Sequence, residues 1–386
     1  MKKSLKKYNL DENFYQASLF TFDSHGCFCA IDTINESPTE TRKIIKVTSL
    51  PAKNVRFAFQ PKDGLVRINK DNGAVEEINI LSSLTSIKEG SIEEYKKFFE
   101  KNGFFFPVSN DHFEELNEEA LYSLIDKMKT TLALISQVSE VQRKDYKKIL
   151  ELTMDLLLST PFELIVGENT YRSCEHLLLK ETLMKGSNKS DNRYFKYDEN
   201  WMFKIHDTIY EEHQMHIDIY RHYLDDPEIL SDLWRNVIFS YVNYQDASSD
   251  ERLLIEVLYH VYFEMRYFEK YVKPDWTKFD DKLKQAVLRL ANIVIAEEIN
   301  ANLGGVYPEY DYKTMEPRWK VNSLLSALYF SFFYMRPNVE VTRVCANPKC
   351  GGFFTVSRTS LKQKYCCPGC ANRANQNNYR ARKLKQ

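Results

Sequence analysis

The chain has 386 residues, of which 43% are hydrophobic and 28% are charged, and its formal net charge is −1. This length and hydrophobicity allow two or three domains with cores of their own, and 24 Tyr and 24 Phe against 12 Gly favour packed helices over a loop-rich or disordered protein. The first ten residues, MKKSLKKYNL, are followed by polar and mixed sequence rather than by an apolar signal segment. We therefore expect a cytoplasmic protein with reduced thiols and no membrane association.

Residues 1–90 are predicted to be a β-containing N-terminal region. Short stretches there alternate apolar and polar residues, as strands with one buried face do. The sequences PKDG at 61–64 and KDNG at 70–73 are typical of turns, and DSHG at 23–26 is predicted to be a hairpin turn. An antiparallel meander is expected, with strands at residues 15–22, 27–33, 43–48, 55–60, 65–69 and 74–80.

Residues 91–340 are predicted to form an α-helical body. Ser91 is followed by two glutamates, which is typical of a helix start, and apolar residues recur at helical spacing through much of 228–300. Such aromatic-rich stripes are typical of a core or of a dimer surface. Helices are predicted at residues 91–101, 116–138, 146–158, 173–184, repeatedly within 228–300, and at 321–335, with loops at 186–193 and 306–317. The helix at 321–335 is too short and too interrupted to span a bilayer.

Candidate reactive residues in the body are few. Four histidines lie close together in the sequence: His206, His213, His216 and His222. The chain has no partner Glu-x-x-His motif, so exposed histidines are favoured over a metal site. Cys27 and Cys29 would share one strand face, where two small buried side chains are expected. We find no Gly-rich phosphate loop, Gly-x-Ser-x-Gly elbow or His-Glu-x-x-His motif, and we predict no catalytic residue and no enzyme.

The last 46 residues, 341–386, differ from the rest of the chain in their cysteine content. They contain five of the eight cysteines, which are Cys345, Cys350, Cys366, Cys367 and Cys370. Two close pairs about fifteen residues apart have the spacing of a tetrahedral Zn²⁺ site, and so small a segment would depend on the metal for folding. Because nothing indicates an oxidising compartment, we expect one zinc ion per chain rather than disulfides. The spacing leaves the third ligand open between Cys366 and Cys367.

The same segment has ten Lys or Arg and no Asp or Glu, whereas residues 1–340 have 43 basic and 54 acidic residues, a net charge of −11. This asymmetry predicts a polyanionic partner for the tail. After Cys370 the sequence predicts a helix with a narrow face of Ala371, Ala374 and Ala381. Arg, Asn and Gln can pair with base edges, and Lys or Arg can neutralise phosphates. The predicted nucleic-acid contacts are Arg358, Arg373, Asn377, Arg380 and Lys383; a solvated, partly frayed basic terminus is the alternative.

The order of residues in the tail is also informative. It runs Cys345-Ala346-Asn347-Pro348-Lys349-Cys350, then Phe354, Ser357-Arg358, Tyr365-Cys366 and Cys370-Ala371-Asn372-Arg373, with a basic end. This pattern resembles the CGNR zinc finger family, with its C-A-N-P-x-C opening, Ser-Arg strand, aromatic-Cys pair and C-G-N-R entry to the last helix. Ala371 stands where the family has Gly, and the last cysteine pair is one residue closer than expected. The resemblance favours Cys366, after Tyr365, as third ligand, and it implies a zinc-dependent, DNA-binding regulator of transcription.

A second resemblance concerns residues 28–35. The sequence FCAIDTIN is similar to the Leu-Asp-x-x-Asn-Thr opening of the ABATE domain, which precedes many CGNR fingers. This similarity implies an ABATE-like N-terminal region.

The expected fold class is therefore α+β, predominantly α-helical, with domains at residues 1–90, 91–340 and 341–386. Nucleic acid is the expected partner, DNA rather than RNA, and the helical body is expected to form a homodimer or to sense a ligand. One alternative is an RNA- or ribosome-binding protein, in which Phe353, Phe354 and Tyr379 stack on unpaired bases. Another is a structural finger on an unrecognised enzyme, whose site would lie around His213 and His216.

Overall fold

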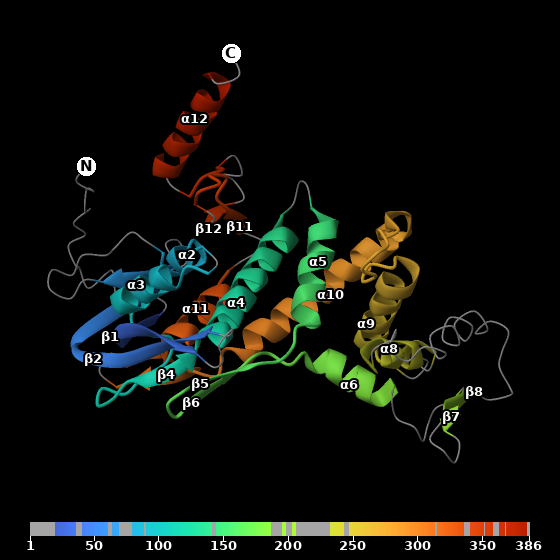
Figure 1. Ribbon diagram of the computed structural model, residues 1–386, viewed down its shortest axis with the longest axis horizontal. Coiled ribbons are helices and arrows are strands. Elements are labelled where there is room, and N and C mark those ends of the chain that lie inside the picture. Colours follow the sequence, from blue (N-terminus) through green and yellow to red (C-terminus); the bar gives the residue numbers. More distant parts are fainter. Residues whose placement is uncertain are drawn as a thin grey trace. The chain divides into compact units, whose positions relative to one another are not determined.

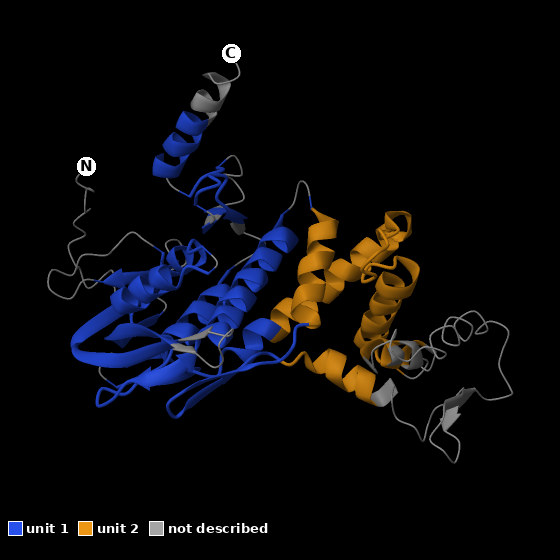
Figure 2. Ribbon diagram, viewed as in Figure 1, with its two compact units in different colours: residues 1–144, 159–174, 298–386 blue, residues 145–158, 175–297 orange. Residues whose placement is uncertain are grey.

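The chain folds as two compact units that the polypeptide enters more than once. The computed structural model describes residues 20–35, 41–60, 64–68, 79–88, 90–140, 144–186, 195–197, 203–205, 232–242, 247–312, 315–335, 340–350, 352–357, 363–366 and 368–383. Unit 1 comprises Met1–Lys144, Ser159–Cys174 and Glu298–Gln386, and unit 2 comprises Asp145–Leu158 and Glu175–Glu297 (Figure 2). The predicted domain limits at residues 90 and 340 stay a prediction.

Unit 1 is built on an antiparallel sheet, as predicted. Strands β1 (Phe20–Asn35), β2 (Thr41–Gln60) and β3 (Gly64–Ile68) pair in chain order, and β4 (Glu114–Asn117) pairs with β2 (Figure 1). Alternate residues of β1 and β2 form stacked aromatic pairs, with ring centroids 5.3 Å apart for Phe20 and Phe59 and 4.8 Å apart for Phe22 and Phe57. Such cross-strand pairs fix the register of a sheet, because a shift by one residue would turn them to the opposite face.

The hairpin turn predicted at residues 23–26 is wrong. β1 continues through this segment, and the register against β2 shifts between His25 and Gly26, where β2 has three additional residues. The polar residues that suggested a turn lie on an exposed part of the strand. Asp23 accepts two hydrogen bonds from the Arg56 guanidinium, at 2.7 and 2.8 Å, which is a paired contact across the sheet. The strands predicted at 43–48 and 55–60 are likewise parts of the single strand β2.

Apart from its C-terminal segment, the other elements of unit 1 are helices and two separate two-stranded sheets. They are α2 (Ile80–Thr85), α3 (Ile92–Asn102), α4 (Glu118–Ser139), β5 (Glu163–Val166), β6 (Asn169–Arg172), β9 (Val306–Asp311), β10 (Glu316–Val321) and α11 (Leu324–Phe333). Helix α3 lies against β1 and ends at Gly103, whose φ is +86° and whose Cβ, if present, would lie 2.6 Å from the His25 carbonyl oxygen. Helix α11 contributes Phe330, which packs on Phe20 with their ring centroids 5.1 Å apart.

Two other predictions for unit 1 differ from the structure. Residues 306–317, expected to be a loop, include most of the β9–β10 hairpin. Its two prolines, Pro308 and Pro317, are tolerated because this two-stranded sheet has only edge strands. The strand predicted at 74–80 falls largely outside the described residues, and Ile80 opens α2 after an Asn79 N-cap. The cysteines Cys27 and Cys29 are buried on β1, as predicted, with their sulfurs 3.8 Å apart.

Unit 2 is mainly helical within its described residues. It contains α5 (Tyr146–Leu157), α6 (Leu177–Gly186), β7 (Phe195–Tyr197), β8 (Phe203–Ile205), α8 (Asp232–Val242), α9 (Ser249–Tyr259), a π-helical turn (His260–Glu264), a 3₁₀ turn (Trp276–Lys278) and most of α10 (Asp281–Ala301). Helices α6, α8 and α9 pack together. The side chains of Ser248 and Glu251 form a capping box that starts α9. Of the apolar residues that recur at helical spacing within 228–300, Leu253 and Val257 lie on α9, and Val261 and Met265 lie in the π-helical turn and just after it. No described helix of the chain is both long and apolar enough to span a membrane.

Candidate metal centre and nucleic-acid interface

The C-terminal segment of unit 1 forms a small hairpin followed by a helix. Strands β11 (Glu340–Val344) and β12 (Phe353–Ser357) pair antiparallel, and α12 (Pro368–Lys383) ends the described chain (Figure 1). The turn between the strands is closed by backbone hydrogen bonds, 2.9 Å from the Cys345 N–H to the Gly352 carbonyl and 2.8 Å from the Cys350 N–H to the Asn347 carbonyl. This turn brings the first two cysteines, Cys345 and Cys350, to one side of the hairpin.

The last two cysteines of the predicted site come from the entry to α12. The sulfurs of Cys345, Cys350, Cys366 and Cys370 all lie within 4.8 Å of one another. The sulfur of Cys366 is 3.7 Å from that of Cys350 and 3.5 Å from that of Cys370. Four thiolates at the usual Zn–S distance on a tetrahedron would lie about 3.8 Å apart, so the cluster fits one Zn²⁺. Of the adjacent pair, Cys366 belongs to the cluster, whereas Cys367 lies outside the described residues.

The surroundings of Cys345 favour the thiolate form of this cysteine. Burial opposes ionisation of Cys345, but hydrogen bonds from the backbone N–H groups of Cys366 and Asn347 outweigh it and lower the pKa of the thiol. For Cys366, burial and the neighbouring Cys370 and Cys350 thiols raise the pKa. Zinc binding at this site would therefore release protons, since the ligands are thiolates.

The hairpin, rather than the helix, attaches this segment to the rest of unit 1. The Ser82 hydroxyl of α2 donates a hydrogen bond to the Phe353 carbonyl of β12. On the other side, the Arg343 Nη2 lies 3.1 Å from a carboxylate oxygen of Glu140, which follows α4. A polar groove of about 350 Å³ beside this ion pair is lined by residues of α4 and of the hairpin. The four-cysteine segment is thus docked on α2 and α4.

Helix α12 leaves one side exposed. Pro368 occupies its first position, where the missing N–H of proline costs nothing. Ala374 is buried and Ala371 is half-buried, which agrees with the predicted small face. Between Cys370 and Asn377, the exposed residues are Asn372, Arg373, Asn375, Gln376 and Asn377. None of the 16 residues of α12 is acidic.

The structure thus places two of the five predicted nucleic-acid contacts, Arg373 and Asn377, on the exposed side of α12. Arg380 and Lys383 belong to the same helix, but their side chains lie outside the described residues, and so does Arg358. Sequence reasoning missed the docking residues Ser82 and Glu140. No local signal could have found them, because Glu140 is 203 positions from its partner Arg343.

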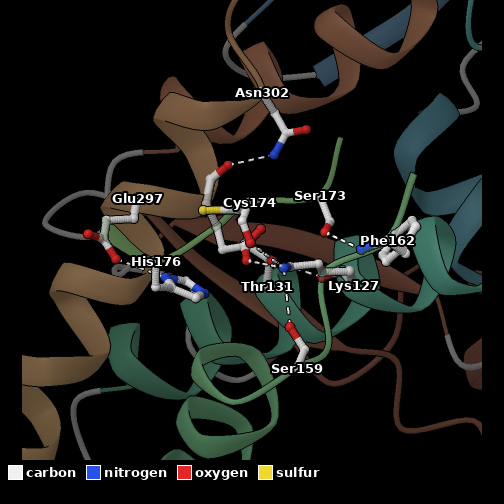
Figure 3. Close-up of polar contacts among 10 residues, drawn as sticks. Lys127, Thr131, Ser159, Phe162, Ser173, Cys174, His176, Glu297 and Asn302 are labelled. Carbon is white, nitrogen blue, oxygen red and sulfur yellow. Dashed lines mark hydrogen bonds and ion pairs between the residues drawn. The ribbon is translucent and has the colours of Figure 1, made fainter. Parts of the chain in front are cut away.

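Besides the cysteine cluster, a group of buried polar and charged side chains lies in the interior of unit 1 (Figure 3). The Lys127 ammonium is 3.0 Å from a Glu298 carboxylate oxygen, 3.2 Å from the Ser159 hydroxyl and 3.1 Å from the Cys174 carbonyl. The side chains of Lys127 and Glu298 are only 4% and 0% exposed. The ammonium donates hydrogen bonds to Ser159 and Cys174, and the Glu298 carboxylate compensates its buried charge as an ion pair.

The Lys127 cluster also has a particular place along the chain. The chain returns from unit 2 to unit 1 at Ser159 and again at Glu298, and it leaves unit 1 for unit 2 after Cys174. Lys127 therefore joins three separate chain segments within unit 1. We interpret it as a structural node. The histidine cluster predicted as surface residues, His206 to His222, lies outside the described part of the chain, so the enzyme alternative gains no site from it.

Unit 2 contains a buried histidine that sequence reasoning did not consider. The His176 Nδ1 lies 2.8 Å from one Glu297 oxygen (Figure 3). The Leu178 backbone N–H donates a hydrogen bond to the other oxygen at 3.1 Å. Burial raises the pKa of Glu297, but the hydrogen bonds from His176 and Leu178 outweigh it and lower the pKa overall.

Comparisons with known proteins bear only on the tail. Residues 342–383 match the CGNR zinc finger family. The tail is therefore a CGNR zinc finger whose four-cysteine cluster suits one Zn²⁺. The match does not extend to the N-terminal region, and the ABATE resemblance of residues 28–35 receives no support. No curated protein and no solved structure matches the chain significantly.

Proposed function

We propose that this chain, with its CGNR zinc finger, is a zinc-dependent DNA-binding protein that regulates transcription. The observation that carries the proposal is the exposed side of α12. It combines Arg373 with carboxamide side chains, has no acidic residue, and follows directly from the cysteine cluster. Arginine and carboxamides are the side chains that pair with base edges in the major groove, and an α-helix fits that groove.

Zinc has a structural role in this proposal. Zn²⁺ held by Cys345, Cys350, Cys366 and Cys370 would fix the hairpin turn to the start of α12, because two ligands come from each. The chain itself supplies the charge, with ten basic residues and no acidic ones in 341–386. Contacts to phosphates then supply most of the affinity, and base contacts supply the preference for sequence.

The finger uses different surfaces for the protein and for the proposed partner. Its hairpin contacts Ser82 and Glu140 of unit 1, whereas Asn372, Arg373 and Asn377 of α12 are exposed. The rest of the chain, with its net charge of −11 over residues 1–340, would repel DNA. We assign to it dimerisation or the sensing of a ligand, and no catalytic activity.

The experiment is DNA binding by the full chain, measured by the fluorescence anisotropy of a labelled duplex. The zinc-loaded protein is expected to bind. The same protein treated with a chelator is expected to lose binding, because α12 is no longer held to the hairpin. A chain ending at Glu340 is the control for contacts made by the body. Equal binding by the zinc-loaded and the truncated chain would refute the proposal.

One observation separates this proposal from RNA binding. The RNA alternative needs exposed aromatic side chains that stack on unpaired bases. Phe353 is only 9% exposed, since it lies at the docked end of the hairpin, and Phe354 is half-buried. Tyr379 lies on α12, with its side chain outside the described residues. Competition of unlabelled single-stranded RNA against the labelled duplex decides between the two partners.

A further inference from the structure

The exposed side of α12 is unusual in its chemistry. Between residues 372 and 378, five of the seven side chains are carboxamides. Four of them are described and all four are exposed, namely Asn372, Asn375, Gln376 and Asn377. The one buried residue among them is Ala374, which lies on the opposite side of the helix. The carboxamides therefore form a continuous exposed surface, which we call the carboxamide face.

This face is not explained by the stability of the helix. Asparagine is among the less favourable residues in helix interiors, because its side chain competes for backbone hydrogen bonds. An exposed helix surface needs no packing, so Glu or Lys in place of the asparagines would serve solubility and helix formation better. Local choices that weaken an element without a structural gain are expected at functional sites.

The angular positions of these residues suit a helix that lies in the major groove of DNA. At 100° per residue, Asn372 and Gln376 lie along the centre of the exposed side, one turn apart. Asn375 lies on one flank, and Arg373 and Asn377 lie on the other. A helix entering the major groove along this centre line would turn its carboxamides to the bases and Arg373 toward one phosphate backbone.

The chemistry of the carboxamide group selects among the bases. Adenine presents one acceptor, N7, beside one donor, the N6 amino group, and a carboxamide offers one donor and one acceptor in the same arrangement. Guanine presents two acceptors, which suit Arg or Lys instead. Two carboxamides at the centre of the face, with the arginine at its flank, therefore favour adenine.

Resting on the proposed function, we propose that the carboxamide face reads adenine in the major groove, with Asn372 and Gln376 making the base contacts. The finger thus prefers duplexes with A·T base pairs at the contacted positions. Asn375 and Asn377 extend the polar surface, and Arg373 contacts the phosphate backbone.

The test uses the full zinc-loaded chain and duplexes of equal length that differ only in central A·T or G·C pairs. Measured by anisotropy, the protein should bind A·T duplexes roughly tenfold or more tightly than G·C duplexes, which is the discrimination expected from one paired base contact. Replacing the central adenines by 7-deazaadenine removes N7 and leaves shape and charge almost unchanged. It should abolish the preference.

A double variant, Asn372→Ala with Gln376→Ala, should retain zinc and bind both duplexes equally, because alanine favours the helix and no charge is lost. Asn292→Ala, at an exposed position of α10, is the matched control and should retain the wild-type preference. Equal wild-type binding to A·T and G·C duplexes, or a preference that survives in the double variant, would overturn the proposal while leaving DNA binding intact. Failure to bind any duplex would overturn the proposed function as well.

Discussion

Replacing Cys366 by serine removes one of the four sulfurs of the cluster. Its sulfur lies 3.7 and 3.5 Å from those of Cys350 and Cys370, close to the separation expected around one Zn²⁺. A structural zinc site contributes on the order of 10–16 kcal/mol, so the loss of one ligand among four should cost about 3–4 kcal/mol. That corresponds to zinc binding weaker by roughly 100- to 1,000-fold.

The neighbouring cysteine is a matched control for this substitution. Cys367→Ser changes the same atom one residue away, and we expect its zinc affinity to stay within about twofold of the wild type. Competition with a chromophoric chelator measures both variants on one scale. Strong loss of zinc from Cys367→Ser, with near-normal binding by Cys366→Ser, would show that the other member of the pair is the ligand and would refute the geometry described above.

Three further predictions concern the rest of the chain. Lys127→Met should destabilise by about 3–5 kcal/mol in urea unfolding, because the buried Glu298 carboxylate loses its ion pair, and adding Glu298→Leu should recover part of this loss. The pKa of Glu297 is lowered in the folded state, so this group stabilises the fold at pH values above its ordinary pKa of 4.5. That stabilisation is lost as the pH falls through the pKa of the folded state. Glu297→Gln should therefore flatten the decline of stability in acid, and an unchanged decline would contradict the His176 contact. Glu140→Ala should leave zinc binding unchanged but increase proteolysis of the finger, since the ion pair with Arg343 is lost; unchanged proteolysis would show that this docking contact contributes little.

The finger was the part of the chain most open to prediction from sequence. Its ligands lie in two short turns, and the helix that follows is continuous, so the whole site is encoded within one segment. Amphipathic helices such as α3, α5 and α9 were also found, because burial of one face leaves a period in the sequence.

Features that depend on contacts between distant residues were not found. The sequence DSHG predicted a turn at 23–26, yet Asp23 pairs with Arg56 on a continuous strand. Propensity cannot reveal a partner 33 positions away. The same holds for the docking of the finger on Ser82 and Glu140, and for the Lys127 node, where a lone lysine on a helix resembles any solvated residue until its neighbours are known.

The measurement that tests the central claim most directly is the salt dependence of duplex binding. With roughly four to six phosphate contacts, log K should fall with log salt at a slope of about −4 to −5. Arg373→Ala should reduce the magnitude of this slope by about one contact, because its exposed guanidinium is assigned to a phosphate. DNA binding that is insensitive to salt, or a slope that Arg373→Ala leaves unchanged, would contradict the account of the finger as the DNA-contacting surface.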